Sequence, residues 1–367
     1  MEEVNVEEKK DQTSIFDQIS QLEHEQLVFC HDEYTDLKAI IGIHNTVLGP
    51  ALGGTRMWHY VSEQEAVTDV LRLSRGMTYK AAISGLNAGG GKAVIIGDVK
   101  KIKSEALMRR FGRFIESLGG RYVTAEDVNM TTRDMEYISM ETKHVTGLPE
   151  SMGGGGDPSP VTAYGVYMGM KALLKSEFGS ESLQGKKVSV QGAGQVGSYL
   201  VELLEKEDAH IFVSDIFPDK INNLTKNHKV TVVDADEIHK LDVDVYAPCA
   251  LGAILNDRTI PELQCKIVAG GANNQLFDEN IHAQMLMDKG IVYGPDFLIN
   301  AGGVMNVYAE YLGGYNRKVV YQLAENIYDT CLEILNTAKK ENITTHDAAK
   351  KLAEKRIRDI GNVKLAF

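Results

Sequence analysis

Apolar residues recur along this chain with two different spacings, and segments of the two kinds alternate. Short runs rich in β-branched residues predict strands at 39–44, 93–97, 121–124, 243–247, 266–269 and 290–293. Apolar residues three or four positions apart predict helices at about 63–76, 104–118 and 161–178, and the chain turns helical and charged after residue 317. Alternation of strands with helices predicts an α/β fold.

The segment around residue 192 carries a glycine pattern typical of a nucleotide site. One strand ends in Gly192-x-Gly194-x-x-Gly197, a helix follows, and the next strand ends in Asp215, 18 residues past Gly197. The pattern alone also occurs at purely structural β–α turns. With both strands, the helix and the acid present, it predicts a Rossmann-type dinucleotide-binding unit within a doubly wound sheet.

Each part of this unit has a physical role toward a dinucleotide. Gly192 permits a tight turn, Gly194 lets the backbone approach a pyrophosphate, and Gly197 lets helix and strand pack closely. The helix N-terminus offers free N–H groups and positive potential to the phosphates. Asp215 can accept hydrogen bonds from both ribose hydroxyls and would repel a 2′-phosphate, so we expect NAD rather than NADP.

A glycine run divides the chain. Residues 153–156 are all glycine, and Asp-Pro-Ser-Pro follows them, so no regular element can continue here and a hinge is expected. The interpretation is two domains separated by a cleft: a substrate-binding, catalytic and oligomerisation domain at 1–150, and the dinucleotide domain at 151–317. The helices at about 318–367 are expected to pack partly back on the first domain.

Composition narrows the class of protein. A net charge of −12 argues against nucleic acid and anionic membranes as partners. The four cysteines have no CxxC spacing, which indicates neither a disulfide framework nor a metal site. The acidic N-terminal segment MEEVNVEEKKDQ predicts no signal peptide, and no apolar run approaches 18 residues. A cytoplasmic protein is expected.

Three charged residues of the first domain stand out. Lys80 ends the segment RGMTYK, and Lys92 follows three glycines and precedes an apolar run, so both are expected beside strand-end or glycine-rich backbone rather than on a charged helix. Asp127, in TAEDVN, closes a predicted strand. The alternatives are a solvated surface charge for each lysine and a helix N-cap for Asp127.

Blocks of sequence in the same order resemble the Glu/Leu/Phe/Val dehydrogenase family, with the leucine dehydrogenases as its nearest branch. The blocks are LGPALGGTRMW at 48–58, RGMTYK at 75–80, GGGKAV at 89–94, TAEDVN at 124–129, GDPSPVTAYGV at 156–166, GAGQVG at 192–197, GGANNQL at 270–276 and INAGGVMNV at 299–307. The resemblance implies an oxidoreductase that oxidatively deaminates an L-amino acid with a nicotinamide cofactor, giving a 2-oxo acid and ammonia. It also implies a homo-oligomer, an octamer.

Family roles pass to the matching residues. The resemblance makes Lys92 the catalytic lysine, Asp127 the proton-transferring carboxylate and Lys80 the partner of the substrate α-carboxylate. Thr162 would orient the nicotinamide amide, and Asn273 would contact both cofactor ribose and substrate. A lysine in a dry cleft near a second cation has a lowered pKa and can act as a base, while its charged form can polarise a substrate oxygen. The other cofactor-binding residues would be Gly192, Gly194, Gln195, Val196, Gly197, Asp215 and Ala250.

Two departures from the glutamate-specific pattern predict an apolar substrate. Leu52 stands where those enzymes carry lysine, and Val307 stands where they carry serine. A side-chain carboxylate buried here would lack a partner, at a cost of several kcal/mol. Branched-chain amino acids, namely leucine, isoleucine and valine, are therefore expected, although ordinary core packing is the alternative for these positions. The expected substrate-side residues are Leu52, Gly53, Met77, Ala125, Val304 and Val307.

Other readings of the sequence stay open. Within the family, a phenylalanine or valine dehydrogenase is the nearest alternative. A 2-hydroxy-acid dehydrogenase would rely on a histidine–carboxylate pair, and none of the ten histidines lies in a recognisable block. A non-catalytic NAD-binding protein would have no need of Lys80, Lys92 and Asp127 together.

Overall fold

The computed structural model describes residues 14–364, so the acidic segment behind the signal-peptide prediction lies outside the described residues. The chain forms two compact units. The first contains the described part of 1–46 together with 50–78 and 89–143, and the second contains 47–49, 79–88 and the chain from 144 onward. The predicted domain boundaries and the cleft between the domains stay predictions.

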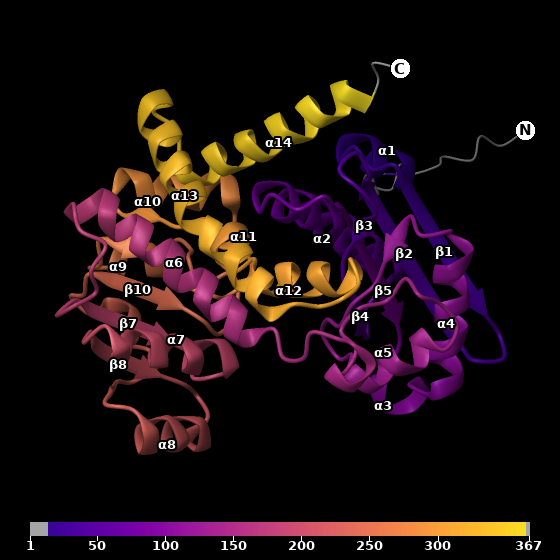
Figure 1. Cartoon of the computed structure of the whole chain (residues 1–367), viewed down its shortest axis with the longest axis horizontal. Coiled ribbons are helices and arrows are strands. Elements are labelled where there is room, and N and C mark those ends of the chain that lie inside the picture. Colours follow the sequence, from indigo (N-terminus) through magenta and orange to yellow (C-terminus); the bar gives the residue numbers. More distant parts are fainter. Residues whose placement is uncertain (1–13, 365–367) are drawn as a thin grey trace, which may run out of the picture. The chain divides into compact units, whose positions relative to one another are not determined.

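The first unit is built on a mixed six-stranded sheet with the order β1-β2-β5-β3-β6, and β4 also pairs with β5 (Figure 1). Strand β2 runs antiparallel to β1 and β5, whereas β3 and β4 run parallel to β5. The strands are β1 (Gln26–Asp32), β2 (Leu37–Asn45), β3 (Ala51–Leu52), β4 (Thr55–Trp58), β5 (Gly89–Ile96) and β6 (Tyr122–Val123). The strands predicted at 39–44, 93–97 and 121–124 are confirmed.

Five helices accompany this sheet. Helix α2 packs on it through a core shared with β2 and β5, in which Val70 and Leu71 of the helix meet Ile40 and Val94 of the strands. Removing these aliphatic side chains from water stabilises the unit by about 1.5–3 kcal/mol each. The helices are α1 (Ile15–Gln21), α2 (Glu63–Ile83), α3 (Val99–Ile102), α4 (Glu105–Ser117) and α5 (Thr132–Ser139).

Helix α2 corrects one expectation. It continues through Gly76 to Ile83, so Lys80 lies in its last turn and not beside a strand end. A Cβ at Gly76 would meet nothing within 4 Å, so this face of the helix is open and the glycine is not there for close packing. A glycine inside a helix costs only about 1 kcal/mol. Tertiary packing of the helix on the sheet is enough to offset that cost.

The glycines before Lys92 also differ in role from the expectation, because they belong to strand β5 itself. A Cβ at Gly90 would lie 2.1 Å from the Thr78 hydroxyl oxygen, and one at Gly91 would lie 2.8 Å from the Tyr122 ring. Glycine in a strand interior marks close approach of another element. Here it lets α2 and β6 press against the strand that carries Lys92.

The second unit contains a wholly parallel sheet with the order β12-β11-β10-β7-β8-β9 (Figure 1). Chain order runs outward in one direction from β7 and in the other from β10, so the topological switch point lies between these two strands. The Rossmann-type prediction is confirmed. The strands are β7 (Lys187–Gln191), β8 (His210–Ser214), β9 (Thr231–Val232), β10 (Val245–Pro248), β11 (Ile267–Val268) and β12 (Val292–Tyr293).

Helices complete the second unit. The predicted helix at 161–178 is confirmed as α6, whose buried stripe includes Val161, Val166, Met170 and Leu174 and which packs against α7 and α13. The helices are α6 (Ser159–Phe178), α7 (Gln195–Lys206), α8 (Pro218–Asn227), α9 (Thr259–Glu262), α10 (Glu279–Asp288), α11 (Asp296–Ile299), α12 (Gly302–Tyr311), α13 (Arg317–Glu341) and α14 (Thr345–Lys364), with 3-10 turns η1 (Glu150–Met152) and η2 (Ile238–Lys240).

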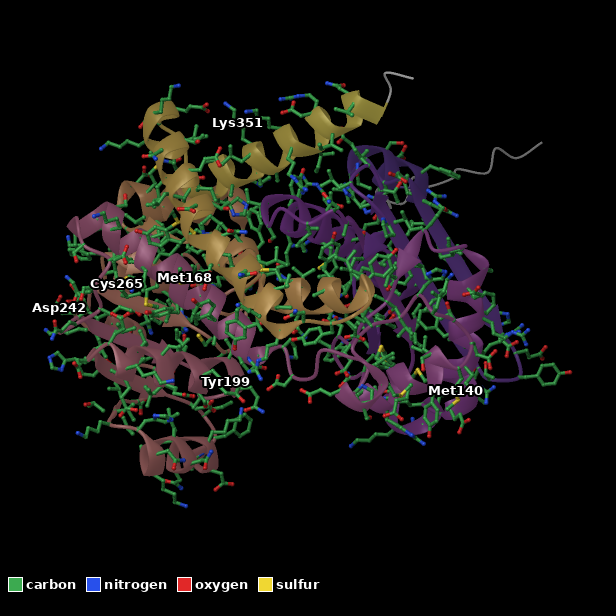
Figure 2. All side chains as sticks on the ribbon, viewed as in Figure 1. Met140, Met168, Tyr199, Asp242, Cys265 and Lys351 are labelled. Atoms are coloured by element: carbon green, nitrogen blue, oxygen red, sulfur yellow. The ribbon has the colours of Figure 1, made fainter. Side chains whose placement is uncertain are left out.

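The last helix contacts a segment from the first 150 residues. Arg356 of α14 donates hydrogen bonds to the carbonyl oxygens of Ala82, Gly85 and Leu86 and to the side chain of Asn87. Ala82 lies in the last turn of α2, and Gly85 and Leu86 follow its end, where a cation is favourable because of the negative potential at a helix C-terminus. Figure 2 shows Lys351, on the same helix, with its exposed side chain directed outward. The C-terminal helix thus caps the turn that carries Lys80.

Within residues 14–364, no helix is long and apolar enough to cross a membrane. The described part of the chain also holds no cluster of three or more metal-ligating side chains. All four cysteines are free thiols, three of them buried. Burial raises the pKa of the Cys30 thiol to about 12, which makes it a poor nucleophile at neutral pH.

Two buried histidines pack edge to face under helix α2, with ring centroids 4.7 Å apart. His24 Nε2 lies 2.8 Å from the Ser74 hydroxyl, and His44 Nδ1 lies 2.7 Å from the Thr78 hydroxyl. Burial lowers the pKa of His24 to about 4 and that of His44 to about 3, and in His44 the neighbouring His24 lowers it further. Both rings are therefore neutral in the folded protein at neutral pH.

Acid should destabilise the first unit through these rings. The folded pKa values lie below the unfolded value of about 6.5, so their stabilisation is complete above pH 6.5 and is lost as pH falls toward 4. Each ring can contribute a fall of up to about 1.4 kcal/mol per pH unit. Urea unfolding between pH 7.5 and 5 checks this. His24→Gln with His44→Gln should flatten the dependence, and an unchanged slope would contradict it.

Candidate active site

A lysine, a carboxylate and an arginine meet at the sheet of the first unit. Strand β5 places Lys92, whose ammonium lies 2.9 Å from Asp127 Oδ2. Asp127 follows β6 and accepts a second contact, from Arg56 Nε of strand β4 at 3.0 Å. The Lys92 side chain is 8% exposed, against 25% for each of the other two. The structure thus brings together the predicted pair Lys92 and Asp127.

Each charged side chain in this cluster shifts the pKa of its neighbours. Burial lowers the pKa of Lys92, while Asp127 acts to raise it and Arg56 acts to lower it further. Burial alone would raise the pKa of Asp127, but Lys92 and Arg56 together hold it below its usual value. The arrangement therefore favours an ionised carboxylate beside a lysine that gives up its proton more readily than a lysine in water. Such a lysine is better suited to act as a general base than a lysine in water.

The network extends beyond the predicted residues. Arg56 Nη1 lies 3.1 Å from Asp69 Oδ2 of helix α2, and the Tyr60 hydroxyl donates to the same oxygen at 2.6 Å. Sequence reasoning missed these three residues. The available signal was an arginine directly before Met57 and Trp58 in a short strand-like segment after Gly53-Gly54, since a partly buried charge requires partners.

The N-cap alternative for Asp127 is wrong. Helix α5 begins after Thr131, whose hydroxyl accepts from the Asp134 backbone N–H while the Asp134 carboxylate accepts from the Thr131 N–H. This reciprocal arrangement is a capping box. Asp127 therefore lies four residues upstream of the cap, and its carboxylate is directed to Lys92 and Arg56 instead.

Four of the expected substrate-side residues lie in the same unit. Leu52 ends β3 and is 1% exposed, and Ala125 is also buried. The N–H of Gly53 donates to the Val123 carbonyl, and a Cβ at Gly53 would lie 1.7 Å from the Gly91 carbonyl oxygen, so only glycine is accommodated there. Met77 is half-buried on α2. The backbone of Leu52 and Gly53 thus runs beside the strand that leads to Asp127.

The second unit assembles a separate polar group around Asn273. Lys80 Nζ donates to Asn273 Oδ1 at 3.3 Å, and Asn300 Nδ2 donates to the same oxygen at 2.8 Å. Asn300 also donates to the Ala272 carbonyl, which fixes the turn that follows β11. The structure therefore brings the predicted residues Lys80 and Asn273 together, and Asn300 was missed although it lies in the INAGG block.

The glycine loop after β7 has the geometry that its sequence predicts. Gly192 has φ +109°, a conformation that side-chain-bearing residues rarely adopt. A Cβ at Gly194 would meet nothing within 4 Å, so the start of α7 is open to a ligand, whereas one at Gly197 would lie 2.0 Å from the Gly192 carbonyl oxygen. Asp215 Oδ2 accepts from the Ala193 N–H at 2.8 Å, and Lys220 lies 3.9 Å from the same oxygen.

The remaining predicted residues lie on neighbouring elements of this unit. Val196 packs on the turn before Asn273, because a Cβ at Gly271 would come 2.6 Å from it. Thr162, in the first turn of α6, donates to the Pro158 carbonyl at 3.0 Å. Gln195 begins α7, Ala250 follows β10 at the switch point, and Val304 and Val307 lie on α12, buried and half-buried respectively.

Comparisons with known proteins agree with this architecture. The dimerisation domain of Glu/Leu/Phe/Val dehydrogenases matches residues 24–144, and the Glutamate/Leucine/Phenylalanine/Valine dehydrogenase model matches 153–218 and 217–363. The chain is 52% identical over 353 residues to a leucine dehydrogenase from Thermoactinomyces intermedius, covering 96% of each chain.

A second relative, which carries a different enzyme name, is about as similar to this chain as the leucine dehydrogenase is. An L-tryptophan dehydrogenase from Nostoc punctiforme is 51% identical over 343 residues, covering 94% of this chain and 96% of that one. The crystal structure of the enzyme from that organism superimposes with a TM-score of 0.85 at 48% identity, covering 95% of this chain and 99% of the other. The predicted family and enzyme class are confirmed: this chain belongs to the Glu/Leu/Phe/Val dehydrogenase family of amino-acid dehydrogenases.

Proposed function

We propose that this chain catalyses the reversible NAD-dependent oxidative deamination of branched-chain L-amino acids. The leucine dehydrogenase relatives support the substrate class. The reaction consumes the amino acid, NAD⁺ and water and yields the 2-oxo acid, ammonium, NADH and one proton. The observation that carries the proposal is the pair formed by the buried Lys92 and the partly exposed Asp127, which offers a base of lowered pKa beside a carboxylate.

The residues of the two units support complementary roles. Lys92 would take a proton from the water that attacks the oxidised substrate, and as an ammonium it would stabilise negative charge on the substrate oxygen. Asp127 would move protons to and from the substrate nitrogen through its carboxylate. Lys80, held by Asn273, would bind the α-carboxylate. Burial lowers the pKa of Lys92, which makes its neutral, proton-accepting form easier to reach than in a lysine in water.

The second unit suits a dinucleotide. The open position at Gly194, the left-handed Gly192 and the N-terminus of α7 together form an anion-binding turn at the switch point. Asp215 stands at the end of the neighbouring strand, where it can accept from a ribose diol. NAD⁺, when bound, supplies the hydride acceptor of the reaction. Thr162, Gln195, Val196 and Ala250 would line its path.

The side-chain pocket would be apolar. Leu52 and Val307 offer no partner to a substrate carboxylate, so glutamate would bring an uncompensated charge. Met77 and Ala125 of the first unit and Val304 of the second are also apolar and would offer a substrate carboxylate no partner. The L-tryptophan dehydrogenase relative, at nearly the same identity as the leucine dehydrogenases, favours an aromatic amino acid as the second candidate.

A substrate panel tests the proposal. NADH formation at alkaline pH and saturating NAD⁺ should be fastest with leucine, isoleucine or valine, weaker with phenylalanine and tryptophan, and nearly absent with glutamate. Hydrophobic pockets separate side chains that differ by a methylene by only about 1–3 kcal/mol, so the three aliphatic substrates should lie within about 200-fold of one another. NADP should be a poor substitute. Faster turnover with tryptophan or phenylalanine than with every aliphatic substrate would move the assignment to the second candidate.

The oligomeric state and the cellular compartment are proposed from the sequence as a whole and not from the site. An octamer is proposed from the family resemblance of the sequence blocks. A cytoplasmic location is supported by the net charge of −12 and by four free cysteines, which suit a reducing compartment. No nucleic-acid or membrane partner is proposed.

A further inference from the structure

Both cations at the site bind one oxygen of Asp127. Lys92 Nζ lies 2.9 Å from Oδ2, and Arg56 Nε lies 3.0 Å from the same atom, so Oδ1 accepts from neither of them. Asp69 fixes another edge of the guanidinium, because its Oδ2 lies 3.1 Å from Arg56 Nη1. Arg56 is therefore held between two carboxylates, one of which is paired with Lys92.

We propose that Arg56 is a positioning residue that holds the Asp127 carboxylate with Oδ2 against Lys92 and leaves Oδ1 for the substrate nitrogen. This inference rests on the proposed function and adds a residue that the family resemblance did not assign. Arginine suits the task because its guanidinium is planar and rigid: with Nη1 bound to Asp69, Nε meets Asp127 Oδ2 from a fixed direction, whereas a lysine contributes a point charge.

The backbone makes the arrangement rigid. Arg56 pairs with Val94 in the parallel ladder between β4 and β5, two residues beyond Lys92. A Cβ at Gly54 would lie 2.5 Å from the Glu126 carbonyl oxygen and 3.0 Å from Asp127 Cβ, so the two backbones touch beside the carboxylate. The positions of Arg56 and Lys92 are thus set by paired strands, and the bridge between Thr55 and Glu126 fixes the backbone next to Asp127.

The charge of Arg56 also acts on Lys92. Arginine stays protonated throughout the working range of an enzyme, so Arg56 cannot exchange protons with substrate. Its positive charge lowers the pKa of Lys92 and shares the negative charge of Asp127. Without the positive charge of Arg56, the negative charge of Asp127 would interact with Lys92 as its single cation in the cluster. Lys92 would then stay protonated up to a higher pH.

Other groups that face the cluster have defined states. Asp69 of α2 binds Arg56 and accepts from the Tyr60 hydroxyl, whose pKa is raised by burial and by Asp69. From β6, the buried Tyr122 hydroxyl donates to the Gly53 carbonyl oxygen, and burial also raises its pKa. Both phenols therefore stay neutral across the pH range of an assay, and Arg56 lowers the pKa of both Lys92 and Asp127, so its loss would move the titration of each toward higher pH.

The test is the pH profile of kcat/KM for leucine in four variants. Arg56→Gln should move the acid-side limb to higher pH by roughly one unit, since a neighbouring charge shifts a pKa by 1–3 units. It should also lower kcat at neutral pH at least tenfold, and activity should recover in part at alkaline pH. Arg56→Lys should keep the limb near its wild-type position with reduced kcat. Asp69→Asn should give a smaller shift, and Arg109→Gln, on an exposed arginine of the same unit, should match the wild type.

A purely structural role would give a different pattern. In that case Arg56→Gln would lower the melting temperature and leave the position of the limb unchanged, which would overturn the inference. NADH affinity, measured by fluorescence titration, should stay at the wild-type value in all four variants. If Arg56→Gln does not fold, the other two variants decide. The inference is then overturned if the limb of Asp69→Asn is unshifted and if Arg56→Lys loses as much kcat as Lys92→Ala.

The result separates this inference from the proposed function. Loss of activity in Lys92→Ala and Asp127→Asn with an unshifted Arg56→Gln profile would reject the role of Arg56 alone. Full activity in Lys92→Ala would reject the site assignment and the role of Arg56 with it. A shifted limb in Arg56→Gln, restored by Arg56→Lys, would support both.

Discussion

Replacing Lys92 with alanine is expected to lower kcat by roughly 10²–10⁴-fold, the usual loss when a general acid–base group is removed. Affinity for NADH should be unchanged, because the glycine loop and Asp215 belong to the other unit. The measurements are single-turnover NADH formation with leucine and fluorescence titration of NADH. Lys101→Ala, on a lysine whose side chain is 79% exposed in the same unit, is the matched control.

Lys80→Ala should fail in a different way. Its contact with Asn273 places it as a partner of the substrate carboxylate, so KM for leucine should rise by roughly 10- to 150-fold, equivalent to the loss of a charged hydrogen bond of 1.5–3 kcal/mol. A smaller fall in kcat is expected from misplaced substrate. If Lys92→Ala changed mainly KM and Lys80→Ala mainly kcat, the two roles would be assigned the wrong way round.

Stability must be measured beside activity. Removing Lys92 leaves the Asp127 carboxylate with Arg56 as its remaining cation, and breaking one partner of a buried pair costs about 3–5 kcal/mol when nothing compensates. Lys92→Met keeps the volume of the side chain and removes only the charge. A melting temperature close to that of the wild type in Lys92→Met, with the same loss of kcat, would attribute the loss to chemistry.

The second unit could be predicted almost entirely from the sequence. Its central strands β10 and β11 are buried throughout and appear in the sequence as short continuous apolar runs, such as the one at 243–247, whereas the exposed edge strand β9 was not predicted. The glycine loop could also be predicted from the sequence. Gly192 is required by its positive φ, and Gly197 is required by a close backbone contact. Local sequence carries these features, so no tertiary information was needed.

The first unit shows where such reasoning stops. The helix predicted at about 63–76 continues to Ile83, because its packing on the sheet outweighs the low helix propensity of Gly76. Arg56 lies 71 residues from Asp127 along the chain, and the two meet because the bridge between Thr55 and Glu126 joins the segments that carry them. Contacts between segments that are distant in the sequence do not change the local periodicity of apolar residues. Arg56 was therefore missed, whereas Lys92 and Asp127 were found.

Exchanging the two residues that depart from the glutamate-specific pattern should change substrate choice. In Leu52→Lys with Val307→Ser, the ratio of kcat/KM for glutamate to that for leucine is expected to rise at least about tenfold, since a fixed charge partner is worth about 1.5–3 kcal/mol. Leucine should lose activity, because each buried CH₂ contributes about 0.8 kcal/mol and the new ammonium must be desolvated.

A control isolates charge from packing. Leu52 is 1% exposed, so Leu52→Met keeps an apolar side chain of similar volume there and should leave the substrate ratio within about threefold of wild type. The steady-state panel of leucine, valine, phenylalanine, tryptophan and glutamate measures all variants. A double variant that folds, turns over leucine more slowly and shows no rise in the glutamate ratio would mean that Leu52 and Val307 do not face the substrate side chain. Specificity would then have to come from Met77, Ala125 and Val304, and aromatic substrates would become the better test of the pocket.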